Sequence, residues 1–173
     1  MEQPRIIVLS GVIDEHSAMD VIVRLMDLDR QDAHAEISLY INSTGGSVDF
    51  GLAIYDVIKH ISAPVSTVCF GMAASMGAFL LSCGQEGRRF ALQNSRILIH
   101  QPLVQTSQGA YRPQTIIKRL ASSLTDSREE LEIILAENVG KTPEEVHADC
   151  ERDNWMSAQQ AKEYGIIDDI LCK

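Results

Sequence analysis

Short apolar runs alternate with amphipathic stretches over the first hundred residues, and this alternation is the strongest constraint on the fold. The runs are 5–9, 37–41 and 65–70, and each ends at small or polar residues before a stretch with apolar residues at helical spacing. Apolar runs of this length are typical of buried strands, and a period of three and four residues indicates helices. Strands and helices in alternation, joined by short turns, predict an α/β fold.

The second part of the chain has a different pattern. One long amphipathic helix is predicted over 115–139 and ends at Gly140, because glycine readily adopts the left-handed conformation of a helix terminus. Since this helix does not alternate with strands, we expect it to project from the core or to pack on another chain. Its apolar stripe favours packing on another chain.

Helix boundaries can also be predicted from capping residues. Thr142 and Ser157 are at positions typical of helix starts, and Ser17 is expected to cap the helix that follows the first strand. A last strand is expected over 166–171. These elements add two short helices and one strand to the α/β pattern.

Length and charge limit the classes of function. The 173 residues suit one domain, and the net charge of −9 argues against a nucleic-acid partner, which needs clustered Lys and Arg. No apolar segment reaches the roughly 18 residues of a membrane span, and the N-terminus lacks the pattern of a secretory signal. The four cysteines have no C-x-x-C spacing, so we expect reduced thiols, no metal site and a cytoplasmic location.

Ser75 is the candidate nucleophile. It lies in Gly71-Met-Ala-Ala-Ser-Met-Gly77, where an apolar strand is expected to turn into a helix. Such a turn exposes the hydroxyl group, and the N–H groups of the helix can hold an anion nearby. The match to G-x-S-x-G is imperfect because Ala73 takes the place of the first glycine. A serine at this position can also be an ordinary helix cap.

Gly45 and Gly46 are candidates for an oxyanion hole. They follow an apolar strand and precede a helix, and glycine allows a backbone N–H to point into a cleft. A phosphate-binding loop is disfavoured because neither G-x-G-x-x-G nor G-x-x-x-x-G-K-[ST] is present. A plain tight turn is the alternative.

His100 is the candidate base, because it ends the predicted strand 96–99 and neutral imidazole accepts a proton from serine near pH 7. A structural role for this histidine stays open. His16, His34, His60 and His147 are less well placed. Asp153 is a candidate to orient the imidazole. Its rivals Asp149, Asp168 and Asp169 cannot be excluded by periodicity.

The chain resembles the proteolytic subunit of Clp protease, known as ClpP, over nearly its whole length. The matching stretches, in order, are Arg5-Ile-Ile-Val-Leu, Tyr40-Ile-Asn-Ser-Thr-Gly-Gly-Ser47, Gly71-Met-Ala-Ala-Ser-Met-Gly-Ala-Phe-Leu-Leu81, Asn94-Ser-Arg, Ile99-His-Gln-Pro102 and Glu151-Arg-Asp153. This resemblance implies a single crotonase-like domain over 1–173 with a projecting handle helix at about 115–139.

The resemblance also implies roles for particular residues. Ser75 is then the nucleophile, His100 the general base and Asp153 the acid that orients it, while the backbone N–H groups of Gly46 and Met76 form the oxyanion hole. Peptide bonds of unfolded proteins would be hydrolysed without a metal or cofactor. The implied assembly is two stacked seven-membered rings that enclose a chamber fed by an AAA+ unfoldase.

The sequence departs from the family pattern at three places. The chain begins almost at the first strand, where the family usually has a segment that lines an axial pore. After Pro102 the usual Gly-Gly pair is replaced by residues 103–113, in a longer connection to the handle, so substrate contacts and ring pairing are expected to differ. Thr44 replaces a proline, which we expect to be tolerated.

Two other classes of function remain as alternatives. The chain could be a non-catalytic or partner-activated structural subunit of a mixed ring, which retention of Ser75 and His100 argues against. It could also be a crotonase-type enzyme acting on acyl-CoA. That enzyme needs no serine–histidine pair, and this sequence offers no basic cluster for the nucleotide.

Overall fold

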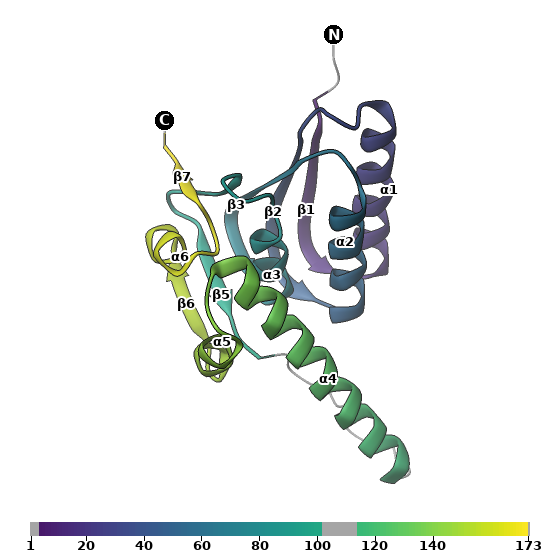
Figure 1. The fold of residues 1–173 in the computed structure, drawn as a ribbon, viewed down its shortest axis with the longest axis vertical. Coiled ribbons are helices and arrows are strands. Elements are labelled where there is room, and N and C mark those ends of the chain that lie inside the picture. The colour runs from purple at the N-terminus through teal and green to yellow at the C-terminus, as the bar shows by residue number, and fades with distance from the viewer. Residues whose placement is uncertain (1–3, 102–113, 173) are drawn as a thin grey trace.

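A sheet of seven strands organises the residues that the structure describes, which are 4–101 and 114–172 of a computed structural model (Figure 1). The strands are β1 (Ile6–Ile13), β2 (Ile37–Gly46), β3 (Val65–Ala74), β4 (Arg89–Leu92), β5 (Arg96–Ile99), β6 (Asn154–Ser157) and β7 (Asp169–Leu171). The helices are α1 (Glu15–Gln31), α2 (Val48–His60), α3 (Met76–Ser82), α4 (Gln114–Val139), α5 (Pro143–Cys150) and α6 (Ala158–Tyr164).

The sheet forks at β3. Its main path runs β1-β2-β3-β4-β7 with parallel pairing throughout. The first half of β3 pairs with β4 at Thr67–Cys69, whereas its last residues, Met72–Ala74, pair in parallel with β5. Strand β6 then adds to β5 in the antiparallel direction. This mixed, mainly parallel sheet confirms the predicted α/β class.

Helix α2 packs against α1 and α3, while α1 packs against β1 and α3 packs against β2 and β3. Ile7 and Leu9 of β1 and Leu39 and Ile41 of β2 point into the resulting core and are at most 1% exposed. All seven residues of α3 are buried, so this short helix is enclosed between the sheet and its neighbours. The start of α3 is therefore fixed by packing on the sheet.

Several predicted boundaries are wrong in an informative way. Strands β2 and β3 continue through polar and glycine-rich ends to Gly46 and Ala74, because their neighbours supply ladder partners. The side chain of Asn42 accepts a bond from Met72 N–H across the two strands. The last strand is shorter than predicted and begins only at Asp169, and β6 was not predicted. Asp14, not Ser17, caps α1, and Ser17 completes the capping box.

The predicted long helix is present as α4, and it extends away from the rest of the chain in Figure 1. Its C-terminal end is anchored by Arg89, which donates to Asn138 O at 2.5 Å and pairs with Asp168 through two side-chain bonds. Burial raises the pKa of Asp168, but the Arg89 bonds outweigh this and hold it below its ordinary value. No helix in the described ranges is long and apolar enough to cross a membrane.

Candidate active site

Ser75 occupies the sharp turn between β3 and α3. Its backbone has φ 54° and ψ −124°. Among the described residues, every other positive φ belongs to a glycine. The turn is held by three backbone bonds: Ser75 N–H donates to Leu98 O at 2.9 Å, and Ser75 O accepts from Ala78 and Phe79 N–H. Although Ser75 sits at the cap position, its side chain makes no capping bond. Its hydroxyl is therefore not used to stabilise the helix.

The glycine turn after β2 lies directly against Ser75. A Cβ on Gly45 would be 2.7 Å from Ser75 Cβ and 2.8 Å from Ala74 O, so a side chain does not fit there without displacing the backbone. Gly45 also has φ 90°, where residues with a Cβ are strained. Its N–H donates to Ser43 Oγ at 3.0 Å, and that buried hydroxyl donates to Gly11 O. The turn is thus fixed against β1 as well as β3.

Two backbone N–H groups are candidates to hold an anion beside Ser75. Met76 is the first residue of α3, so its N–H belongs to the first turn, where N–H groups have no acceptor within the helix. Gly46 lines the same pocket as Ser75 and Met76. The positive end of the helix dipole adds to the attraction for negative charge at this point.

His100 follows β5 and lines the same pocket as Ser75. Its Nδ1 lies 3.3 Å from Asp153 Oδ1, and the imidazole is 14% exposed whereas the carboxylate is 66% exposed. The other three acids have different partners. Asp149 accepts from the Tyr164 hydroxyl, Asp168 pairs with Arg89, and Asp169 pairs with Lys162. Asp153 is therefore the carboxylate, among the four considered, that reaches His100.

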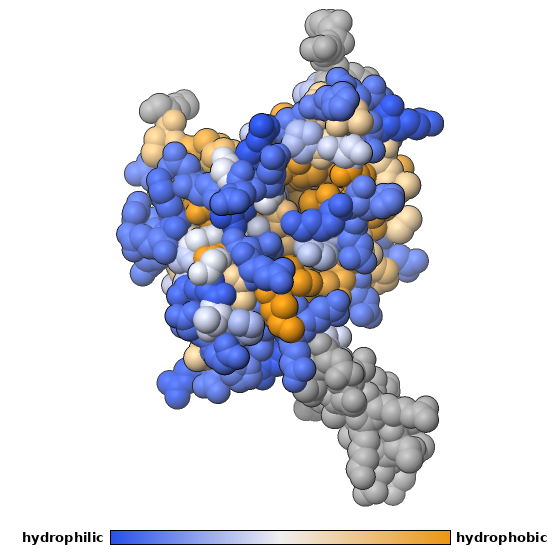
Figure 2. All heavy atoms as spheres, in the orientation of Figure 1, coloured by the Kyte–Doolittle hydropathy of each residue, from blue (hydrophilic) through white to orange (hydrophobic). Residues whose placement is uncertain are grey.

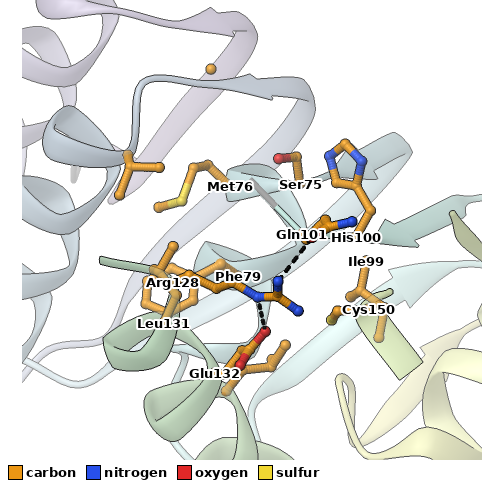
Figure 3. A pocket seen from close by; sticks show the side chains of 13 residues that line it. Ser75, Met76, Phe79, Ile99, His100, Gln101, Arg128, Leu131, Glu132 and Cys150 are labelled. Carbon is orange, nitrogen blue, oxygen red and sulfur yellow. Dashed lines mark hydrogen bonds and ion pairs between the residues drawn. The ribbon is translucent and has the colours of Figure 1, made fainter. Parts of the chain in front are cut away.

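The pocket beside Ser75 measures about 90 Å³. Figure 3 shows the side chain of Ser75 and the ring of His100 at the same edge of this pocket. Six apolar side chains are part of the lining, and they are Val48, Met76, Phe79, Ile99, Leu131 and Leu135. The pocket can take an uncharged side chain of a bound chain while the adjoining backbone lies near Ser75.

Polar residues that the sequence did not single out complete the lining. Arg128 of α4 donates to Glu132 Oε1 at 2.7 Å and to Gln101 Oε1 at 2.9 Å, as the dashed lines in Figure 3 show. Arginine and glutamate four residues apart are a recognisable helical pair, and Gln101 is next to the candidate base. Nothing in the sequence indicated that the two would meet.

Cysteine chemistry is disfavoured at this site. Cys150 lines the pocket, and its burial, together with the nearby charges of Glu132 and Asp149, raises its pKa to about 12. The thiol is therefore protonated at neutral pH and is a poor nucleophile. Among the residues described, no group of three or more His, Cys, Asp or Glu is placed to hold a metal ion.

The site geometry and a comparison with known families together assign the chain to a protein family. A strained serine at a strand-to-helix turn, a histidine paired with a carboxylate and a pocket between them fit a serine hydrolase. The family model described as Clp protease matches residues 1–173. The chain therefore belongs to the Clp protease family and is a serine peptidase of the ClpP type.

Proposed function

We propose that Ser75, His100 and Asp153 form the catalytic triad of a serine endopeptidase that spans residues 1–173 as one domain. The observation that carries this proposal is that the strained Ser75 turn and His100 line the same pocket. The Nδ1 of this histidine lies 3.3 Å from Asp153 Oδ1. A serine used only as a helix cap would have its hydroxyl bonded to the first turn, and Ser75 does not.

The proposed reaction proceeds by acyl transfer. Ser75 Oγ attacks the carbonyl carbon of a peptide bond and gives its proton to Nε2 of His100, because Nδ1 is directed to Asp153. The N–H groups of Gly46 and Met76 bind the oxyanion. His100 then passes the proton to the leaving amine, and water hydrolyses the ester to free Ser75. The chain's own residues supply each proton transfer, so no metal or cofactor is required.

We further propose that the substrate is an unfolded polypeptide and that the chain works as an oligomer. Both faces of a parallel sheet are normally covered. Here one side of β1 exposes Ile6, Val8 and Val12, and the outer face of α1 exposes Met19, Val23 and Met26. Figure 2 shows apolar surface on the side where β1, α1 and α2 lie. Exposed apolar surface of this kind supports association between subunits.

The assembly we propose is two stacked heptameric rings in the cytoplasm, with α4 acting as the handle between the rings and an AAA+ unfoldase delivering substrate. Family membership and the extended position of α4 support this arrangement. Enclosing the sites in a chamber would restrict an unselective peptidase to chains that are already unfolded.

A second candidate is a non-catalytic or partner-activated subunit of a mixed ring. Two observations favour it: no hydrogen bond joins Ser75 and His100, both in the described part of the chain, and Asp153 is largely exposed. A neighbouring subunit that covers Asp153 would shield its contact with His100 from water and so strengthen it. Catalytic hydrogen bonds are often long in the absence of substrate, so the first candidate is retained.

Covalent labelling with an alkyl fluorophosphonate distinguishes the two candidates. We expect labelling of Ser75, located by mass spectrometry, and its loss in Ser75→Ala together with a fall in peptide hydrolysis of at least about 10⁴-fold. Native mass spectrometry should give the same assembly for both proteins, because Ser75 lines the pocket and the exposed apolar residues of β1 and α1 do not.

The other results point to different conclusions. An assembled wild-type protein that is not labelled would contradict the peptidase proposal for the isolated chain. Labelling that begins only after a second ClpP-type subunit is added would support the partner-activated subunit. Loss of assembly in Ser75→Ala would leave the serine with a structural role.

A further inference from the structure

Gln101 joins the two loops that carry His100 and Asp153. It follows His100 directly, its backbone N–H donates to Cys150 O at 2.8 Å, and its side-chain amide donates to Glu151 O at 3.3 Å. Both acceptors come just before Asp153 in the chain. The position of Gln101 therefore determines how closely the imidazole and the carboxylate approach.

Arg128 of α4 holds the remaining polar atom of the Gln101 side chain, because its Nη1 donates to Gln101 Oε1 at 2.9 Å. The same guanidinium donates through Nε to Glu132 Oε1 at 2.7 Å, and its Nη2 lies 3.2 Å from His147 Nδ1 of α5. A planar guanidinium with several fixed donors suits one side chain that contacts three elements. Arg128 thus connects α4, α5 and the loop after β5.

Glu132 keeps Arg128 in place. Its carboxylate is nearly buried, and a buried charge requires partners. Arg128 satisfies Oε1, and His147 Nδ1 lies 2.9 Å from Oε2. The arginine therefore cannot rotate into solvent without leaving a buried carboxylate short of a partner, which fixes its contact with Gln101.

We propose that Arg128 is a positioning residue for the catalytic base: it acts through Gln101 to set the approach of His100 to Asp153. This rests on the peptidase function proposed above. Arg128 also lines the pocket, so the rival roles are contact with substrate and simple stabilisation of the α4–α5 contact. The three roles predict different kinetics.

The test measures fluorophosphonate labelling of Ser75 and peptide hydrolysis in five assembled variants. For Arg128→Met we expect labelling rate and kcat to fall about 10- to 100-fold with KM within about twofold, because small displacements of a base are costly. Gln101→Met should give a similar loss. Because this variant keeps the Arg128–Glu132 pair intact, it provides the test if Arg128→Met does not fold. Arg128→Lys should lose less, because lysine can retain one of the bonds.

The double variant Arg128→Met/Gln101→Met separates positioning from stabilisation. If Arg128 acts through Gln101, the double variant loses no more activity than the worse single variant, whereas independent roles give losses that multiply. Arg88→Met is the matched control, since Arg88 pairs with Glu36 at the surface away from the pocket. It should be labelled like the wild type.

Several outcomes would overturn the proposal. Multiplicative losses, unchanged labelling in Gln101→Met, or a rise in KM alone would each assign Arg128 to another role. A wild-type protein that is not labelled at all is a separate result, because it would remove the peptidase function itself and this proposal with it.

Discussion

The two halves of the candidate active site are held by different kinds of contact. Ser75 is positioned by main-chain bonds to Leu98, Ala78 and Phe79 and lies against Gly45, in a region where the whole of α3 is buried. His100 is positioned mainly by side-chain contacts, which come from the exposed carboxylate of Asp153 and the amide of Gln101, together with one main-chain bond from Gln101 N–H to Cys150 O.

This difference separates what is rigid from what can be adjusted. Main-chain bonds inside a sheet break only when the sheet opens, whereas side-chain contacts near the surface compete with water and depend on what covers them. The nucleophile half should therefore be fixed by folding, and the base half should respond to its surroundings. The following predictions test this contrast, from the largest expected effect to the smallest.

Replacing the orienting acid should have the largest effect. Asp153→Asn should lower kcat by about 10² to 10⁴-fold, because an amide neither stabilises the charged imidazolium nor selects its tautomer. The measurement is hydrolysis of a fluorogenic peptide by the assembled protein. Asp169→Asn is the matched control, because Asp169 has similar exposure, 62%, and pairs with Lys162 instead. Equal losses in both variants would show that general surface charge, rather than His100, is responsible.

A Cβ in the glycine turn should damage the nucleophile half. Gly45→Ala combines a positive φ with a contact of 2.8 Å to Ala74 O, so we expect a loss of about 3 kcal/mol in unfolding free energy. Gly87→Ala is the control, since Gly87 has φ 80° but open space around it, and should lose about 1 kcal/mol. Urea unfolding measures both, and equal values would mean that Gly45 is not in close contact.

The smallest effect concerns the strain at Ser75. Ser75→Gly should be more stable than Ser75→Ala by about 1 kcal/mol, because glycine adopts φ 54° and ψ −124° without strain while alanine does not. Both variants lack the hydroxyl, so the comparison isolates the backbone. Urea midpoints of the two proteins give the difference, and a lower midpoint for the glycine variant would show that the turn is relaxed.

Local signals in the sequence predicted the helix ends well. Thr142 and Ser157 both cap helices as expected, and α4 ends just before Gly140, whereas α1 is capped by Asp14 in place of Ser17. These features depend only on residues a few positions apart. The ends of β2 and β3 were predicted too early, because their polar and glycine residues become strand only through pairing with neighbouring strands.

The candidate site could be predicted only in part for the same reason. Ser75 could be nominated from the pattern of its own strand-to-helix turn, and Gly46 from the glycine pair after β2, whereas Met76 was nominated only through the resemblance. Choosing Asp153 over its rivals required the resemblance, because the partners of the four acids lie elsewhere in the chain. No sequence pattern predicted the contact of Arg128 with Gln101, because that contact depends on where α4 packs.

The fork at β3 has a consequence for biosynthesis. Strand β5, which ends beside His100, gains its second neighbour only from β6, and β6 begins immediately after Asp153 near the C-terminus. A chain emerging from the ribosome therefore exposes Ser75 long before the strand that completes the fork has been made. In the proposed triad, the serine would lack an oriented base until then, and a nascent chain would be inert toward the other unfolded chains around it.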